Sequence, residues 1–141
     1  MNDLCFDHQI VFIYVRDLKN SSAFYEGIMG FPLVLDQGSC RIIQTAEGGY
    51  LGYCGHQGER SLGEKNLVLT LVTTQVDDWY AYLQDKEVKI IDPPKINPKY
   101  DIYHFFLKDP DGYLVEIQQF LNPAWEDGGV SEIVKRDGAE G

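Results

Sequence analysis

The stretch YVRDLKNSSAFYEGIMGF, residues 14–31, contains the first complete folding signal of the chain. It closes a run of β-branched and aromatic residues and then breaks that run with polar residues, of which Asp17, Asn20 and Ser21 can each cap a helix. The apolar residues that follow at helical spacing are Phe24, Tyr25, Ile28 and Met29. Gly30 then lies where a C-cap glycine would end the helix. The stretch therefore predicts a strand, a helix and a sharp exit.

A second signal, FFLKDPDGYLVEI, spans residues 105–117 and places an Asp-Pro-Asp-Gly turn between two apolar strands. Around the two signals, the order strand, helix, strand, strand, strand occurs twice, at a period of about 60 residues. The predicted strands are 8–15, 31–35, 40–45, 50–54, 67–72, 88–91, 103–108 and 113–120. Thr74 is predicted to cap the second helix, and the proline-rich stretch 92–98 to form a rigid loop. The first strand is expected to be buried on both faces, because its apolar run is nearly continuous.

Both quoted stretches resemble the vicinal-oxygen-chelate superfamily, which includes glyoxalases, bleomycin-resistance proteins and extradiol dioxygenases. The shared features are a strand ending in Val-x-Asp-Leu, a helix with Phe-Tyr, a Gly-Phe exit and the late Asp-Pro-Asp-Gly hairpin followed by a Glu. The resemblance implies an α+β fold in which paired βαβββ modules form a curved mixed sheet that encloses a cup. It implies one domain, 1–122, with modules at about 6–55 and 65–121, and a flexible or docking tail, 123–141. The extra hairpin in each repeat argues against a ferredoxin-like repeat, which has one fewer strand per unit.

The resemblance also implies a homodimer and, in metal-dependent members, a divalent cation that acts as a Lewis acid in the cup. The positions that it assigns to metal ligands are Ile10, Tyr53, Val68 and Glu116. Isoleucine and valine cannot coordinate a metal, so one carboxylate remains of the usual set. A shifted set of His8, His104 and Glu116 would supply two histidines and a carboxylate, since His8 lies two residues from Ile10 on the same strand face. No cofactor is firmly predicted, and this divalent-metal site is kept as an alternative.

Glu116 is the leading candidate for contact with a ligand, because an inward carboxylate among aromatic residues is costly to bury unless it is paired. It can serve as a catalytic base or as a counter-charge, or it can simply pair with Arg41 or Tyr53. Aromatic residues make up 13% of the chain, enough to line an apolar site as well as a core. The residues predicted to bind the ligand are Tyr53, Tyr100, His104 and Phe106. His56, in a glycine-rich connector, is predicted to be solvated.

The net charge of −10 argues against nucleic acid or an anionic membrane as a partner, because both need a basic protein face. The longest apolar run, Ile10–Val15, is far shorter than the roughly 20 residues that span a bilayer. The first residues carry neither a basic patch nor a long apolar stretch, so a cytoplasmic location is predicted. In such a reducing compartment, Cys5, Cys40 and Cys54 are expected to be free thiols.

Three functions are compatible with these observations. The first is a metal-independent protein that binds an unidentified small molecule in an aromatic, acidic cup, as bleomycin-resistance proteins do. The second is a metal-dependent lyase, isomerase, transferase or dioxygenase that uses the shifted ligand set. The third is a cofactor-free enzyme with Glu116 as general base. The sequence favours binding and leaves open whether the protein is an enzyme.

Overall fold

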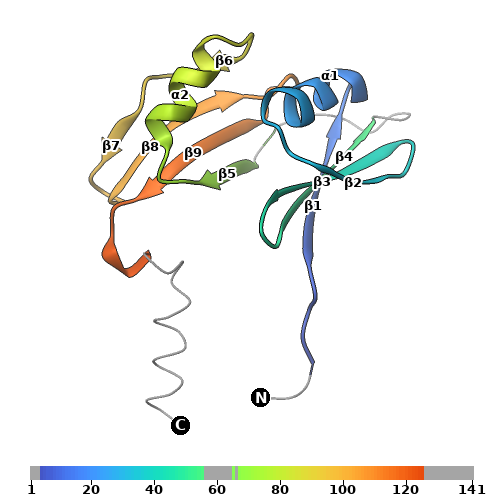
Figure 1. Ribbon diagram of the computed structural model, residues 1–141, viewed down its shortest axis with the longest axis horizontal. Coiled ribbons are helices and arrows are strands. Elements are labelled where there is room, and N and C mark those ends of the chain that lie inside the picture. The colour runs from blue at the N-terminus through green and yellow to red at the C-terminus, as the bar shows by residue number, and fades with distance from the viewer. Residues whose placement is uncertain (1–3, 56–64, 66, 126–141) are drawn as a thin grey trace. The chain divides into compact units, whose positions relative to one another are not determined.

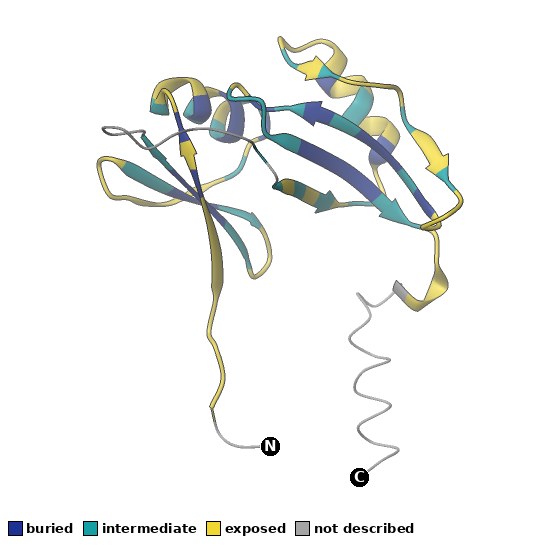
Figure 2. Cartoon of the chain, turned by 180° about the vertical axis from the view of Figure 1, so that it is seen from behind, coloured by how far each residue is buried: buried dark blue, intermediate teal, exposed yellow. Residues whose placement is uncertain are grey.

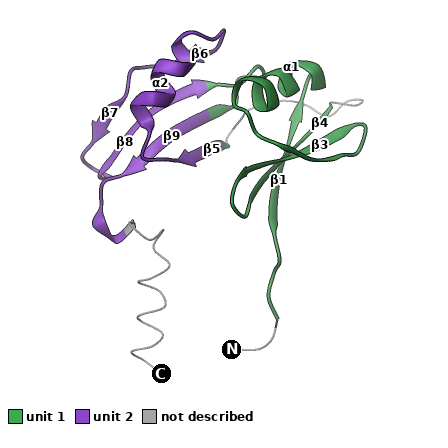
Figure 3. Cartoon of the chain, in the orientation of Figure 1, with its two compact units in different colours: residues 1–67, 108–114 green, residues 68–107, 115–141 purple. Residues whose placement is uncertain are grey.

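The computed structural model describes residues 4–55, 65 and 67–125. They divide into two compact units (Figure 3). Unit 1 comprises residues 1–67 and 108–114, and unit 2 comprises residues 68–107 and 115–141. Residues 108–114, which form the turn between the last two strands, are thus grouped with unit 1. The residues on either side of this turn are grouped with unit 2. The predicted connector, including His56, and residues 126–141 of the predicted tail lie outside the described residues.

The two sheets repeat one strand order (Figure 1). In unit 1, the order β1-β4-β3-β2 is built from β1 (Gln9–Val15), β2 (Leu33–Asp36), β3 (Cys40–Ala46) and β4 (Gly49–Gly55). In unit 2, the order β5-β9-β8-β6 is built from β5 (Val68–Val72), β6 (Lys89–Ile90), β8 (Ile102–Lys108) and β9 (Leu114–Phe120). In unit 1, β1 runs parallel to β4, while the β2–β3 and β3–β4 pairs are antiparallel. The predicted α+β class with a repeated mixed sheet is confirmed.

The helix of unit 1 begins where the sequence predicts. The Asp17 side chain caps α1 (Leu18–Ser22) by accepting a hydrogen bond of 2.8 Å from the backbone N–H of Lys19. The chain then widens into a π-helical segment, η1 (Ala23–Ile28), in which the Met29 N–H donates to the Phe24 carbonyl at 2.8 Å. Gly30 ends the segment with a φ of 78°, a conformation that favours glycine.

Two predictions for unit 2 were wrong in detail. The helix α2 (Val76–Gln84) has Gln75 rather than Thr74 as its N-cap, and the Thr73 hydroxyl accepts from the Gln75 N–H at 3.0 Å. The predicted rigid loop contains a short strand, β7 (Lys95–Asn97), that pairs antiparallel with β8. This pairing is possible because the prolines at 94 and 98 flank the strand, so all three of its residues keep a backbone N–H. A 3₁₀ turn, η2 (Pro123–Trp125), follows β9.

The most deeply buried side chains lie on the helix side of each sheet. Figure 2 shows the dark blue of buried residues along β8 and β9, in contrast to the exposed β7. The fully buried core of unit 1 is formed by Val15, Tyr25, Ile43, Leu51 and Tyr53. That of unit 2 is formed by Val76, Leu83, Leu107, Val115 and Ile117. In unit 2, the Phe105 ring contacts Tyr80 of α2 at 5.4 Å between ring centroids, which identifies the helix-covered face of the sheet.

The prediction that the first strand is buried on both faces was wrong. In β1 only Ile13 and Val15 are buried, and Phe12 is 51% exposed. Its register partner is Gly52 on β4, and a Cβ on Gly52 would lie 2.3 Å from the Phe12 ring. The aromatic ring therefore lies directly against the glycine backbone, which requires a residue without a side chain at position 52.

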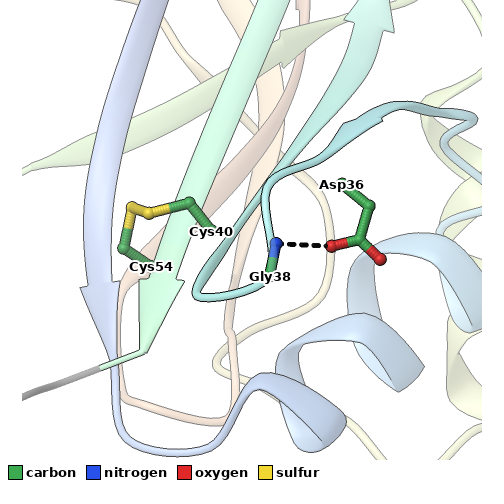
Figure 4. Close-up of a disulfide and its surroundings, with 4 residues drawn as sticks. All are labelled: Asp36, Gly38, Cys40 and Cys54. Atoms are coloured by element: carbon green, nitrogen blue, oxygen red, sulfur yellow. Dashed lines mark hydrogen bonds between the residues drawn. A yellow bond between two sulfur atoms is a disulfide. The ribbon is translucent and has the colours of Figure 1, made fainter.

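The prediction of three free thiols was also wrong. Cys40 and Cys54 are register partners on β3 and β4, and they form a disulfide with their Cα atoms 4.0 Å apart (Figure 4). The cystine follows a tight turn in which the Gly38 N–H donates to the Asp36 carboxylate at 2.9 Å. Cys5 is free and exposed. The disulfide was not predicted because it depends on the register of β3 and β4. The spacing of 14 residues between the two cysteines does not give that register.

Substitution of Gly52 by Ala is expected to destabilise the protein by about 1–3 kcal/mol, because the new methyl group must displace the Phe12 ring. Urea unfolding of the variant measures the loss. Gly27→Ala is the matched control, since a Cβ there meets nothing within 4 Å and alanine favours a helix. Equal stability of the two variants would contradict the close contact.

Protein purified without reductant is expected to show one reactive thiol per chain after denaturation, that of Cys5, and three after reduction. Reduction should lower the free energy of unfolding by about 3 kcal/mol, the typical value for a loop of this length. Thiol titration and urea unfolding measure both effects, with Cys5→Ser as the control that keeps the cystine. Three thiols before reduction would restore the prediction made from the sequence.

Candidate functional site

A polar cluster lies on three adjacent strands of unit 2. The Glu116 carboxylate on β9 accepts a hydrogen bond of 2.8 Å from the Thr70 hydroxyl on β5. Its other oxygen lies 2.6 Å from His104 Nδ1 on β8. The Gln118 amide, with its nitrogen turned to the carboxylate, donates to both oxygens at 3.1 and 2.8 Å. We call these four residues, Thr70, His104, Glu116 and Gln118, the Glu116 cluster.

Strand alternation explains why these side chains meet. Glu116 and Gln118 are two residues apart on β9 and so share a face, while Val115 and Ile117 between and beside them are buried on the other. His104 alternates in the same way with Phe105, whose ring contacts α2. The order β5-β9-β8 then places the three strands side by side. The cluster therefore lies on the face of the sheet opposite α2.

Three of the four residues are buried, Thr70 on the edge strand β5 is exposed, and the Glu116 carboxylate is fully engaged. Relative exposures are 5% for His104, 8% for Glu116 and 7% for Gln118. An ionised carboxylate only accepts hydrogen bonds, so the partner atom on His104 must be a protonated Nδ1 that donates. Three donors surround the charge, which offsets much of the cost of burying it. Glu116 thus has little free capacity to act as a base itself.

The atom that the cluster leaves unused is His104 Nε2. It makes no hydrogen bond to the described residues. It is also not fully enclosed by them, since Ser21 Oγ is the one fully enclosed side-chain N or O atom without a partner in the part of the chain that the structure describes. Phe106, two residues along the same face, contacts the His104 ring at 5.3 Å with an interplanar angle of 70°. With Nδ1 protonated, a neutral imidazole presents a lone pair at Nε2. A neutral His104 therefore has a hydrogen-bond acceptor, Nε2, on a ring that contacts Phe106.

The partners suggested for Glu116 by the sequence, Arg41 and Tyr53, lie in unit 1 and bind another carboxylate. Arg41 donates to Glu26 from Nε at 2.9 Å and from Nη2 at 2.8 Å, and to Asp36 at 2.9 Å. The Tyr53 hydroxyl also bonds Glu26, and it lies 3.1 Å from the Ser22 hydroxyl. The hydrogen bonds from Arg41 lower the pKa of Glu26 to about 2, while burial raises the pKa of Tyr53. Pairing of Glu116 with Arg41 or Tyr53 is thus ruled out as the explanation of its burial.

The other residues predicted for the site are dispersed. Tyr53 is fully buried and stacks on Tyr25 at 5.7 Å, on the helix side of its sheet. Tyr100 is 61% exposed in the turn before β8, with Lys99 Nζ 5.2 Å from its ring centroid. His8 belongs to unit 1 and contacts the edge of Tyr50 at 5.4 Å. Of the predicted residues, the structure brings together Glu116, His104 and Phe106.

The residues present do not fit the metal site that the resemblance implies. Within residues 4–55, 65 and 67–125, no three His, Cys, Asp or Glu side chains are grouped so that they could hold a metal ion. Ile10 and Val68 stand at two of the expected ligand positions and have no donor atom. Both oxygens of the one remaining carboxylate, Glu116, already accept hydrogen bonds from Thr70, His104 and Gln118. We therefore derive no chemistry from a bound metal.

Sequence reasoning missed Thr70 and Gln118. Thr70 is the one polar residue in the apolar stretch 67–72, and a lone polar side chain in such a stretch is a candidate for a hydrogen bond to a neighbouring strand. Gln118 lies two residues after Glu116, so period-two alternation places it on the same face. Both signals were readable, but only the order of the strands shows that the two residues converge on one carboxylate.

A hollow lies along α2. It has a volume of about 260 Å³ and is lined by Gln75, Asp78, Trp79 and Tyr82. Trp79 and Tyr82 meet edge to face at 5.7 Å, and Lys86 Nζ lies 4.9 Å from the Tyr82 ring centroid. None of the residues predicted for the site lines this hollow, so it does not bear on the Glu116 cluster.

A family model described as the Glyoxalase/Bleomycin resistance protein/Dioxygenase superfamily matches residues 6–117. The chain therefore belongs to this superfamily, as the resemblance indicated. No curated protein matches the chain. Among the described residues, no helix has the length and apolar character needed to cross a membrane.

Solved structures support the same fold. A family enzyme from Burkholderia phytofirmans is 21% identical with a TM-score of 0.67, covering 79% of this chain and 97% of its own. A virulence protein from Salmonella typhimurium is 19% identical with a TM-score of 0.64, covering 83% and 99%. TioX from Micromonospora is 18% identical with a TM-score of 0.66, covering 82% and 100%. At these identities the similarity shows the fold alone.

Arg41→Gln is expected to lower stability at neutral pH by about 1–3 kcal/mol, through the loss of charge-assisted hydrogen bonds to Glu26. Because the pKa of Glu26 is about 2 in the folded protein and 4.5 ordinarily, its contribution is present above pH 4.5 and disappears as the pH falls toward 2. The variant should therefore lose stability less steeply over that interval. Urea unfolding between pH 7 and 2 measures both effects.

The control for this experiment is Arg16→Gln. The Arg16 side chain is 72% exposed and lies 3.9 Å from Asp111, so its loss should change stability by no more than about 0.5 kcal/mol. Parallel pH profiles for wild type and Arg41→Gln would show that Arg41 does not set the pKa of Glu26.

Proposed function

We propose that this protein binds a small aromatic molecule at the Glu116 cluster, without a metal. The observation that carries the proposal is the buried Glu116–His104 pair, fixed by Thr70 and Gln118, with an aromatic residue beside it. Such a cluster holds a polar group rigidly in a weakly solvated place, which is what a specific small-molecule site needs. The alternative is a metal-dependent lyase, isomerase, transferase or dioxygenase that uses His8, His104 and Glu116.

The structure changes the charge that we expect of the ligand. A free buried carboxylate would favour a cationic ligand, but the Glu116 charge is already surrounded by three donors. The group left for a ligand is the neutral acceptor His104 Nε2. The proposed ligand therefore needs no positive charge.

A homodimer is part of the proposal. The two edge strands of the unit 1 sheet, β1 and β2, carry exposed apolar side chains: Ile10, Val11, Phe12, Leu33, Val34 and Leu35. Exposed apolar groups on edge strands usually mark contact surfaces. Light scattering of the purified protein gives the mass in solution, and a monomer at all concentrations would remove this part of the proposal.

The proposed location is the cytoplasm. A partly accessible cystine such as Cys40–Cys54 would meet a reducing thiol pool there. Alkylation of thiols in intact cells, before lysis, reports whether this pair is reduced in place. A fully oxidised pair in freshly trapped cells would favour an oxidising compartment.

Binding is tested with two neutral hydroxylic probes, benzyl alcohol and phenol, and with the cationic probe benzyltrimethylammonium. We expect the first two to raise the melting temperature, with no change after treatment with a chelator. Glu116→Gln should weaken their binding roughly fivefold, since it replaces a charge-assisted hydrogen bond to His104 with a neutral one. Calorimetry measures the affinities.

Two controls make the binding test decisive. Glu47→Gln removes an exposed carboxylate in the β3–β4 turn and should leave binding unchanged. His8→Asn should also have no effect, whereas the metal-dependent alternative requires its loss to release a stoichiometric metal detected by elemental analysis. A probe response that is equal in wild type and Glu116→Gln would exclude the Glu116 cluster as the binding site.

A further inference from the structure

The orientation of His104 has a chemical consequence for the ligand. Nδ1 lies 2.6 Å from a carboxylate oxygen, and that carboxylate also accepts from Thr70 and Gln118. An ionised carboxylate accepts from all three partners, and Nδ1 then carries the proton. In the neutral ring, the other nitrogen is then obliged to be an acceptor. The carboxylate therefore fixes the tautomer of the histidine.

The surroundings of Nε2 define what could approach it. On the same face of β8, Phe106 contacts the imidazole ring at 5.3 Å, and Ile102 on the other side of His104 is buried. The stripe Ile102, His104, Phe106 thus consists of one acceptor between two apolar side chains. A planar apolar body bearing a single donor matches this stripe, since it would lie against the half-buried Phe106 ring and satisfy the nitrogen.

We propose that His104 Nε2 accepts a hydrogen bond from the hydroxyl of an aromatic ligand, a phenol in chemical class, and that Glu116 is the positioning residue that holds the accepting tautomer. This inference rests on the proposed function, because it names the ligand class of the same site. No bond is made or broken, and the phenol keeps its proton.

The ligand test compares phenol with anisole, which differ only in the hydroxyl hydrogen and a methyl group. At about pH 8, where phenol stays protonated and an ordinary imidazole is neutral, wild-type protein should prefer phenol by roughly tenfold, the value of one hydrogen bond to a buried acceptor. His104→Phe should abolish the preference. Phe106→Leu should weaken both ligands and keep the ratio, and His8→Asn, an exposed histidine of unit 1, should change neither.

A second measurement reports the tautomer of His104 directly. Nitrogen-15 NMR of the three histidines, at a pH where imidazole is neutral, distinguishes a bare Nε2 from a protonated one. We expect His104 to carry its proton on Nδ1, and Glu116→Gln to admit the other tautomer. If Glu116 had only a structural role, Glu116→Gln would change the stability of the protein. It would not change the His104 tautomer and the preference for the phenol together.

The outcomes separate the inference from the proposed function. Equal affinity for phenol and anisole, with both weakened by Glu116→Gln, would overturn the phenol proposal and leave the binding site in place. A protonated Nε2 on His104, or a preference that survives in His104→Phe, would also overturn it. Failure of every aromatic probe to bind would remove both.

Discussion

The burial of one carboxylate is the constraint on which unit 2 depends. Glu116 is 8% exposed, and an ionised group in that position is tolerated only when donors surround it. The donors come from β5, from β8 and from Glu116's own strand, so the carboxylate bonds across both of its neighbours in the sheet. A slip of either pairing by one residue would turn the donor to the opposite face. The same interaction therefore specifies the register of the central strands and orients the ring of His104.

The parts of the fold that were predictable depend on neighbours in sequence. The Asp17 cap, the left-handed Gly30 and the turn that contains Gly112, with a φ of 92°, are each decided within a few residues. The repeat of the strand–helix–strand–strand–strand order follows from two sets of such local signals. For the same reason, the residues of the quoted stretches carried enough information to identify the superfamily.

The parts that were missed depend on which residues face each other across strands. The Cys40–Cys54 pair, the convergence of Thr70 on Glu116 and the pairing of β7 with β8 all require a register that no single segment encodes. The choice of Tyr53 as the counterpart of Glu116 has the same origin. Aligning the motif that begins at Gly49 with the motif that begins at Gly112 matches these two residues, yet the Tyr53 hydroxyl bonds the helix segment of its unit. Glu116 lies on the face opposite α2, so this alignment of the repeats pairs residues that lie on different faces of their sheets.

The two units place their charged side chains on different faces of their sheets. In unit 1, the charged network of Glu26, Arg41 and Tyr53 lies between helix and sheet, where it ties η1 to β3 and β4. The other face of that sheet carries Phe12 packed on Gly52, and no ionised group of β4 lies there. In unit 2, the helix side is apolar and the charge lies on the opposite face. Two modules of one topology thus place their ionised groups on opposite faces, and only unit 2 presents a charged, oriented cluster where a ligand could use it. Polar recognition by this protein is therefore expected to come from unit 2, with unit 1 contributing apolar surface.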